Sequence, residues 1–268
     1  MTQRPYYEDD HVTLHLGDAL AVLREMPAAS VDSVVTSPPY YGLRDYGHDD
    51  QWGAESSVHE YVERLRVLFV ELRRVLVPTG AVWLNLGDTY AGKANASTAA
   101  GSFDRDRPAR QIAQRNRLQD APYKSLIGVP WRVALALQDD GWAVRNELVW
   151  AKSNPMPHPV ADRLNAAHET VFLLTPRPRY YFDLDAVREP IRNPEVNAPR
   201  LLGNGRRNTF GRLVLTVTPP DGTVLDPFNG RGTTGRVARL NGRRYVGIDL
   251  NAGYLDLTVA GLAQGVLS

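Results

Sequence analysis

Apolar side chains along this sequence recur at two spacings, and each spacing predicts one kind of element. Between Val58 and Val77 they recur every third or fourth residue, which is typical of an amphipathic helix. Helical spacing also appears at residues 18–26, 129–140 and 233–240. Short apolar runs predict strands at residues 31–36, 81–86, 147–150, 170–174, 222–226 and 245–248. Because helices and strands alternate, the pattern predicts an α/β fold with a mostly parallel sheet covered on both faces.

Turn-forming residues and polar segments divide these elements. Pro78-Thr79-Gly80 is expected to end the long helix, so that the next strand begins at Ala81. Residues 208–219 form a short apolar segment that predicts a strand. Residues 91–128 and 190–212 lack periodicity and are expected to be an excursion from the core and a connection, respectively. We therefore expect one domain over residues 1–268 that carries these two insertions.

Composition narrows the class of protein. No run approaches the ~18 apolar residues that span a bilayer, and Met1–Asp10 has no apolar signal region, so we expect no membrane role. The chain contains no cysteine, which excludes disulfides, thiolate metal ligands and thiol nucleophiles and fits a reducing cytosol. The six histidines show no zinc-ligand spacing, so no metal is implied.

The net charge is only +1, but the basic residues are not spread evenly. Phosphate binding needs a locally positive surface, which does not require a positive total charge. A second, smaller basic group lies in residues 190–212. A solvated loop of mixed charge and a DNA-binding surface are both open for the first group. Its members within residues 91–128 are Arg105, Arg107, Arg110, Arg115, Arg117 and Lys124.

A glycine-rich turn follows the strand at 222–226 and leads directly into a helix. Glycines let backbone amides approach a ligand, and a helix N-terminus favours anionic groups. Asp249 stands seventeen residues past Gly232, at the end of the next strand, where an acid can hold ribose hydroxyls. Such a unit suits NAD, FAD or S-adenosylmethionine. The carboxylate of Asp226 would repel a pyrophosphate but tolerate an ammonium group, which favours S-adenosylmethionine.

A second motif, Thr36-Ser37-Pro38-Pro39-Tyr40, ends the strand at 31–36. Hydrogen-bond acceptors that hold amino hydrogens orient the nitrogen lone pair toward a methyl donor. The Ser37 hydroxyl and the Pro38 carbonyl are such acceptors, and proline keeps this carbonyl out of a β-ladder. Tyr40 offers an aromatic face to a base taken out of the stack, a contact worth ~1–3 kcal/mol. The combination points to methyl transfer onto an exocyclic amine.

These two motifs resemble the hallmarks of the amino-methyltransferase family of DNA methyltransferases, S/D/N-P-P-Y/F/W and F-x-G-x-G. The first motif precedes the second, which is similar to the circularly permuted β group, and the likeness extends over about three quarters of the chain. The resemblance implies a Rossmann-like S-adenosylmethionine-dependent methyltransferase fold. It also implies a mostly parallel seven-stranded sheet with one antiparallel strand, and a flipped base in double-stranded DNA as substrate.

The resemblance also implies roles for individual residues. Ser37, Pro38, Pro39 and Tyr40 would be catalytic. Asp18 would lie near the adenine amino group of the cofactor, and Asp249 would hold its ribose. The complete implied cofactor set is Asp18, Ala19, Leu20, Thr36, Asp226, Pro227, Phe228, Gly230, Gly232, Thr233, Thr234, Asp249, Leu250 and Asn251. The expected DNA contacts are Arg44, Arg105, Arg107, Arg110, Arg115, Arg117, Lys124, Lys152, Asn154 and Met156, of which the last three would line the target-base pocket.

The target base follows from the missing thiol. Methylation of cytosine C5 requires a cysteine thiolate that adds to the ring, so this reaction is excluded. Cytosine N4 and adenine N6 remain, and in the resembled family Ser before Pro-Pro favours cytosine N4. Adenine N6 is the alternative. We expect a cytoplasmic, nucleoid-associated monomer or homodimer with a cognate restriction endonuclease as partner.

Two alternatives from other classes stay open at this point. A catalytically inactive relative would bind DNA without transferring a methyl group. A nicotinamide-dependent oxidoreductase would need a pyrophosphate loop and an acid or base for hydride transfer, for which His168 is the only candidate.

Overall fold

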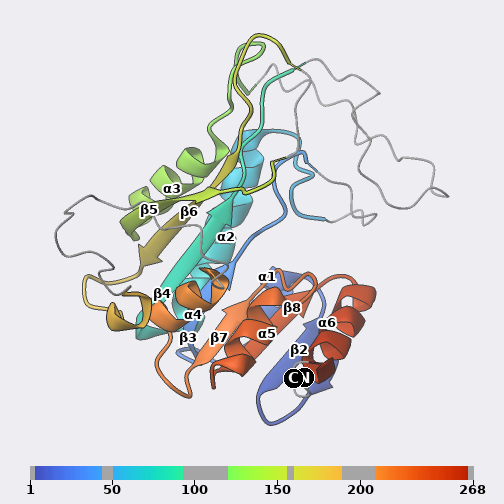
Figure 1. Ribbon diagram of the computed structural model, residues 1–268, viewed down its shortest axis with the longest axis vertical. Coiled ribbons are helices and arrows are strands. Elements are labelled where there is room, and N and C mark those ends of the chain that lie inside the picture. The colour runs from blue at the N-terminus through green and yellow to red at the C-terminus, as the bar shows by residue number, and fades with distance from the viewer. Residues whose placement is uncertain (1–3, 44–50, 93–119, 156–159, 189–208, 265–268) are drawn as a thin grey trace.

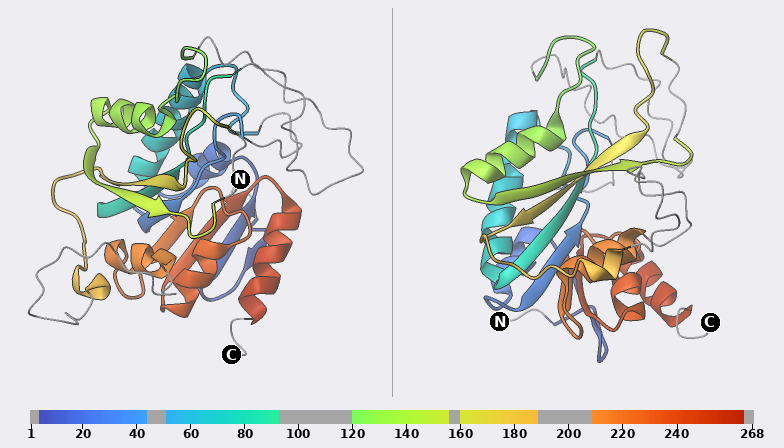
Figure 2. Two further views of the ribbon diagram at one scale, coloured as in Figure 1. Left: turned by 45° about the horizontal axis from the view of Figure 1, so that its top comes forward. Right: turned by 60° about the vertical axis from the view of Figure 1, so that its left-hand side comes forward.

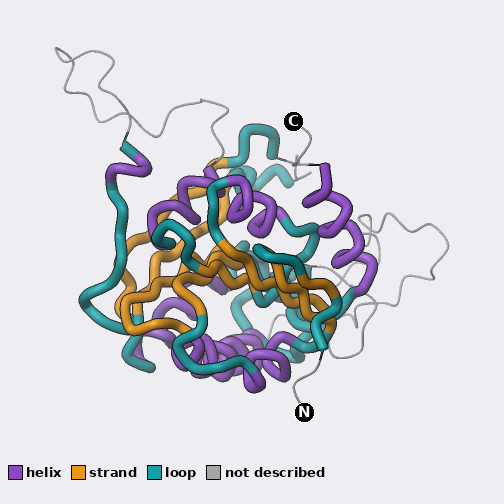
Figure 3. Tube along the Cα trace, turned by 90° about the horizontal axis from the view of Figure 1, so that it is seen from below, coloured by secondary structure: helices purple, strands orange, loops and turns teal. Residues whose placement is uncertain are grey.

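The computed structural model describes residues 4–43, 51–92, 120–155, 160–188 and 209–264. Within these residues one mixed sheet runs through the protein, and helices lie against both of its faces (Figures 1 and 3). No helix in these ranges is long and apolar enough to cross a membrane. Arg44, Met156 and the arginines at 105, 107, 110, 115 and 117, which we expect to contact DNA, lie outside the described residues.

The sheet has the order β1-β2-β8-β7-β3-β4-β6-β5. From β2 to β4 along this order all neighbours are parallel, whereas β6 is antiparallel to both β4 and β5. This confirms the mostly parallel sheet with β6 as the reversed strand. The sheet has eight strands rather than the predicted seven, because the short β1 adds a second antiparallel strand at the edge. The strands are β1 Tyr7–Glu8, β2 Val12–Leu16, β3 Val31–Thr36, β4 Leu76–Leu86, β5 Ala143–Ala151, β6 His168–Thr175, β7 Thr223–Asp226 and β8 Arg244–Asp249.

Six α-helices and one short 3-10 helix accompany the sheet in the described ranges. Helices α1 to α3 cover one face and α4 to α6 the other (Figures 2 and 3). Alternation along the strands explains this division, since successive side chains point to opposite faces: Val82 and Leu84 join one core, and Trp83 joins the other. The helices are α1 Ala19–Glu25, α2 Val58–Val75, α3 Val129–Asp139, η3 Asp185–Val187, α4 Thr209–Val217, α5 Thr233–Leu240 and α6 Ala252–Gln264.

The boundary between the long helix and the next strand differs from the prediction. Helix α2 ends at Val75, and β4 begins at Leu76 rather than at Ala81. Residues 77–80 form a bulge in β4, because Val31 pairs with Leu76 and Ser33, only two residues later, pairs with Ala81. Pro78-Thr79-Gly80 therefore bends a strand and does not separate two elements.

The prediction of a strand over residues 208–219 is wrong. The segment forms helix α4, which buries Leu213, Val214 and Val217 against the sheet. Val217 follows Leu213 by four residues and Val214 by three, the spacings that place side chains on one face of a helix, so burial of these side chains favours a helix. Apolar and β-branched residues such as those of this segment are also typical of strands. The local sequence does not show which face of the segment the sheet will cover, so it could not distinguish the two. Elements β1, β2 and α6 were not predicted.

Candidate active site

The serine-proline-proline-tyrosine motif and the glycine turn leave the sheet side by side. Strands β3 and β7 are parallel neighbours, with Ser33 opposite Val224 and Val34 opposite Leu225. Their carboxyl ends therefore lie at the same edge of the sheet, where α/β folds place ligands. We name residues 36–40 the catalytic corner, after the role that the sequence predicts for them, and residues 226–232 the glycine turn. The catalytic corner and the glycine turn therefore lie side by side at adjacent strand ends.

Asp226 joins these two loops. Its carboxylate accepts hydrogen bonds from the Thr36 hydroxyl at 2.7 Å, the Thr234 hydroxyl at 2.9 Å and the Phe228 amide at 3.1 Å. The side chain is buried, and burial raises the pKa of Asp226 to about 6 because none of these partners carries a positive charge. The contact of Asp226 with a cofactor remains a prediction, since each of these partners is a protein group.

The glycine turn is fixed from the neighbouring strand end. Asp249 accepts from the Gly230 amide at 2.8 Å and from the Asn251 amide at 2.9 Å. Gly230 and Gly232 have φ values of 51° and 73°, which favour glycine. Among the residues that the structure describes, a Cβ built at Gly230 would meet only the Phe228 carbonyl oxygen, 3.9 Å away, so the turn has an open side there.

The cofactor candidates separate into three groups by exposure. A half-buried group forms the rim of the strand ends: Asp18, Leu20, Phe228, Gly230, Asp249, Leu250 and Asn251. A buried group supports that rim from below: Ala19, Thr36, Asp226, Pro227, Gly232 and Thr234. Thr233 is exposed at the start of α5. The rim residues suit direct ligand contacts, whereas the buried residues suit support of the turn.

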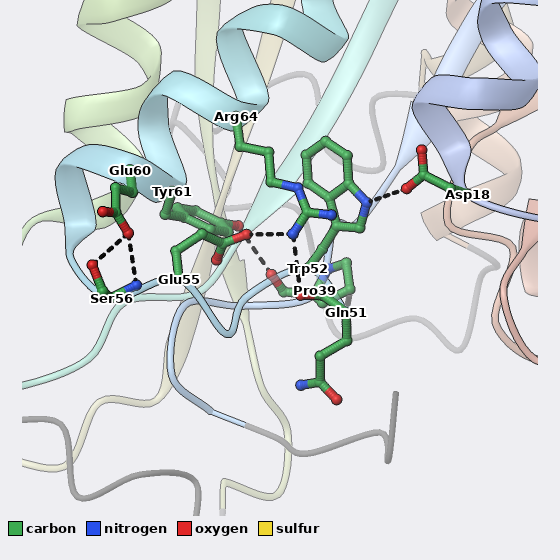
Figure 4. A network of polar contacts seen from close by, with 9 residues as sticks. All are labelled: Asp18, Pro39, Gln51, Trp52, Glu55, Ser56, Glu60, Tyr61 and Arg64. Atoms are coloured by element: carbon green, nitrogen blue, oxygen red, sulfur yellow. Dashed lines mark hydrogen bonds and ion pairs between the residues drawn. The ribbon is translucent and has the colours of Figure 1, made fainter. Parts of the chain in front are cut away.

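Trp52 connects the rim to the helix layer, and sequence reasoning missed it (Figure 4). Its indole N–H donates to Asp18 at 3.1 Å, and its ring meets Phe228 edge-on with centroids 5.2 Å apart. The guanidinium of Arg64 lies 4.1 Å from the ring centroid and also donates to Glu55 at 3.0 Å. The sequence signal that could have identified Trp52 was a bulky aromatic residue next to a glycine in a polar segment. Trp52 is only 2% exposed, so it supports the rim residues Asp18 and Phe228 from behind.

The segment that carries Trp52 also packs on the catalytic corner. The Gly42 amide donates to the Gly53 carbonyl at 2.7 Å. A Cβ at Gly53 would lie 2.7 Å from the Tyr40 carbonyl oxygen, and its φ of 81° is also unfavourable for other residues. The Tyr61 hydroxyl of α2 donates to the Pro39 carbonyl at 3.1 Å (Figure 4). Helix α2 therefore holds the catalytic corner by a hydrogen bond to the backbone of the corner.

On the other side of the corner, Tyr40 contacts a half-buried acid. The Tyr40 hydroxyl donates to Glu169 at 2.9 Å, and the Asn85 amide donates to both, at 3.1 Å and 3.0 Å. Lys152 forms an ion pair with Glu169 at 2.7 Å. Burial favours the neutral acid, but the hydrogen bonds from Lys152, Asn85 and Tyr40 together outweigh it and lower the pKa of Glu169. Glu169 and Asn85 are site residues that sequence reasoning missed.

The expected DNA-binding residues that the structure describes fall into different places. Lys152 reaches the catalytic corner through Glu169. Asn154 is exposed near the end of β5. Lys124 forms an exposed ion pair with Asp162. Of these three, Lys152 is the residue that joins the corner, and the part of the chain that the structure describes shows no cluster of potential metal ligands.

The sheet order, the glycine turn after β7 and the catalytic corner after β3 define a Rossmann-like methyltransferase domain. The sequence profile of the DNA methylase family of N6 and N4 enzymes matches residues 31–210 and 207–260. The chain therefore belongs to this DNA methylase family, which is S-adenosylmethionine-dependent.

Characterised relatives are similar over nearly the whole chain. The Type II methyltransferase M.Cfr9I of Citrobacter freundii is 43% identical over 264 residues, which cover 92% of this chain and 86% of the relative. M.XycI of Xanthomonas campestris pv. cyanopsidis is 42% identical over 262 residues, 91% of this chain and 85% of that protein. These matches identify a Type II DNA methyltransferase of the N4/N6 family, and they remove the support for a nicotinamide-dependent enzyme.

Solved structures share the fold at lower sequence identity. The PvuII DNA methyltransferase, described as cytosine-N4-specific, superimposes with a TM-score of 0.68 at 20% identity, covering 97% of this chain and 89% of that one. A putative DNA modification methylase of Thermus thermophilus, complexed with S-adenosylmethionine, gives a TM-score of 0.63 at 23% identity and covers 96% of both chains. At these identities the likeness shows the common fold.

Proposed function

We propose that this protein transfers a methyl group from S-adenosylmethionine directly to the N4 amino group of a flipped cytosine in duplex DNA. The observation that carries the proposal is the linkage of the catalytic corner to the glycine turn through Asp226. This linkage supports an acceptor for the amine on one strand end and a cofactor cradle on the next. The cytosine-N4 specificity of the structurally similar PvuII enzyme agrees with it.

The residues present fit the cofactor. The open side of the turn at Gly230 leaves room for a ligand where a side chain would otherwise stand. Half-buried Asp249, Leu250 and Asn251 would surround the ribose, and Asp18 and Phe228 would face the adenine. When bound, S-adenosylmethionine supplies an electrophilic methyl group on its sulfonium sulfur.

The catalytic corner would hold the target amine. The Ser37 hydroxyl and the Pro38 carbonyl accept its two hydrogens and turn the nitrogen lone pair toward the methyl group. The Tyr40 ring stacks on the extruded base, a contact worth ~1–3 kcal/mol. A neutral serine as acceptor favours the cytosine amine, which is why we place cytosine N4 before adenine N6.

Recognition and cellular setting are part of the same proposal. We place DNA recognition in the basic residues of 91–128, with residues 190–212 as a second basic connection in a single domain. The Type II relatives point to a cognate restriction endonuclease as partner. Duplex DNA as substrate suggests a cytoplasmic, nucleoid-associated protein, either monomeric or homodimeric, which sedimentation of the purified protein distinguishes.

Sequencing of genomic DNA from an expressing host, with a method that reports modified bases, tests the proposal. We expect N4-methylcytosine at one short sequence motif. N6-methyladenine at a motif would show that the substrate is adenine, while the type of reaction, methyl transfer to an exocyclic amine, would stay as proposed. Binding of S-adenosylmethionine with no modified base, and no tritium transfer to duplexes containing the motifs of the relatives, would favour the catalytically inactive alternative.

A further inference from the structure

Three side chains from separate parts of the fold meet at the carboxylate of Glu169. Glu169 is the second residue of β6, Lys152 follows β5, Asn85 lies near the end of β4, and Tyr40 belongs to the catalytic corner. We call these four residues the Glu169 cluster. The cluster lies beside the catalytic corner, so an ionised acid stands close to Ser37, the neutral acceptor of the proposed reaction.

The directions of the hydrogen bonds in the cluster follow from the number of protons on each group. An ionised carboxylate only accepts, so the single hydroxyl proton of Tyr40 is given to Glu169, 2.9 Å away. The two lone pairs of the Tyr40 oxygen then remain for donors. Asn85 supplies one of these donors through its amide at 3.1 Å.

Ser37 supplies the second donor. Its hydroxyl lies 3.3 Å from the Tyr40 oxygen, the longest contact in the chain of bonds. Because the Tyr40 proton is already used, Ser37 must donate here. A serine hydroxyl that donates its only proton to one partner can offer other groups only its lone pairs. Toward any third group, such as an amine N–H, Ser37 is then an acceptor only.

We propose that Glu169 is a positioning residue which, through the Tyr40 hydroxyl, fixes Ser37 as the acceptor of the target amine. The inference rests on the proposed function. It explains how a neutral serine can serve where members of the resembled family also carry aspartate: the negative charge stands two hydrogen bonds away rather than on residue 37. Lys152 and Asn85 keep the acid ionised and in place.

A purely structural role for Glu169 makes a different prediction. As a simple ion pair with Lys152 at the sheet edge, it would affect folding or ligand affinity and leave the relation between Tyr40 and Ser37 untouched. A double-mutant cycle between Glu169 and Tyr40 distinguishes the two roles, because residues that act as one unit give non-additive losses.

The experiment compares Glu169→Gln, Tyr40→Phe and the double variant in single-turnover methyl transfer. Glutamine keeps the shape but can donate to Tyr40 and reverse the relay, and phenylalanine keeps the stacking ring without the hydroxyl. We expect each single variant to slow transfer by about 10–100-fold, because misplacement of a reacting group can cost about 100-fold in rate. The double variant should be no slower than the worse single variant, and affinities for S-adenosylmethionine and duplex should change less than the rate.

Glu63→Gln is the matched control, because Glu63 also pairs with a basic residue, Arg66, but on the outer face of α2. It should leave the rate unchanged. Multiplicative losses in the double variant, or a fall in ligand affinity as large as the fall in rate, would overturn the proposal. A substrate found to be adenine would refute only the cytosine assignment, since the same cycle then runs on that substrate.

A readout without turnover covers the case of an inactive protein. The hydroxyl proton of Tyr40, bonded to a carboxylate, should give a downfield proton resonance that Tyr40→Phe removes and Glu169→Gln moves upfield. Absence of this resonance from the wild-type spectrum, or no change of it in Glu169→Gln, would refute the relay regardless of activity.

Discussion

Two buried or half-buried acids flank the catalytic corner, and their surroundings are opposite. Asp226 has uncharged donors around it, and its pKa rises to about 6. Glu169 has the ammonium group of Lys152 among its partners, and its pKa falls in spite of burial. The two acids therefore have different roles: Asp226 joins the glycine turn to the end of β3, whereas Glu169 keeps a negative charge beside Tyr40.

Opposite pH dependence of stability is the largest expected consequence. Folded Asp226 keeps its proton up to about pH 6, whereas an unfolded aspartic acid releases it near pH 4. Its contribution is therefore present at low pH and lost as pH rises through this window, by up to roughly 3 kcal/mol. Glu169, with its lowered pKa, contributes stability above about pH 4.5 that is lost as pH falls.

Denaturant unfolding at several pH values measures this contrast. Relative to wild type, Asp226→Asn should gain stability from about pH 4 to pH 7, and Glu169→Gln should lose stability as pH rises from acid toward neutrality. Slopes of the same sign for both variants would show that the two acids do not differ in the way described.

The second-largest effect concerns the corner between the two acids. Ser37→Ala removes the proposed acceptor of the target amine, so turnover should fall by about 100-fold, or ~2.7 kcal/mol. Cofactor affinity, measured by calorimetry, should stay within about twofold. An equal loss of both would mean that Ser37 supports the cofactor side instead.

A smaller effect is expected on the cofactor side. Trp52→Phe keeps the aromatic packing on Phe228 and removes the hydrogen bond to Asp18, so affinity for S-adenosylmethionine should fall by roughly fivefold, about 1 kcal/mol. Trp142→Phe is a matched control, because Trp142 also lies under an arginine and meets a phenylalanine edge-on at 5.4 Å. Equal losses in both variants would argue against a role of Trp52 in the site.

The smallest effect belongs to the basic insertion. Replacing Arg115 and Arg117 by alanine should reduce the salt dependence of DNA binding by roughly one unit of slope for each lost phosphate contact. Fluorescence anisotropy of a labelled duplex at increasing salt gives the slope. If the slope is unchanged, these arginines are not part of the DNA surface.

Local patterns predicted the elements that carry the two motifs, and contacts over long sequence distances were the part that could not be predicted. β3 and α5 match their predicted bounds because their apolar spacing and glycine or proline boundaries are contained in neighbouring residues. Helix α4 was mistaken for a strand because its buried face is decided by the sheet beneath it. Tyr40 and Glu169 are 129 residues apart, and no local spacing joins them.

Gly87 illustrates how a single missing atom constrains two positions at once. A Cβ at this residue would stand 2.6 Å from the ring of Tyr40, and the backbone there lies outside the left-handed region. Any amino acid could adopt this backbone, so the aromatic ring alone excludes a larger one. Positions 40 and 87 should therefore vary together: a side chain can be added at residue 87 only in a protein that has a smaller ring at position 40, which would also reduce the proposed stacking surface for an extruded base.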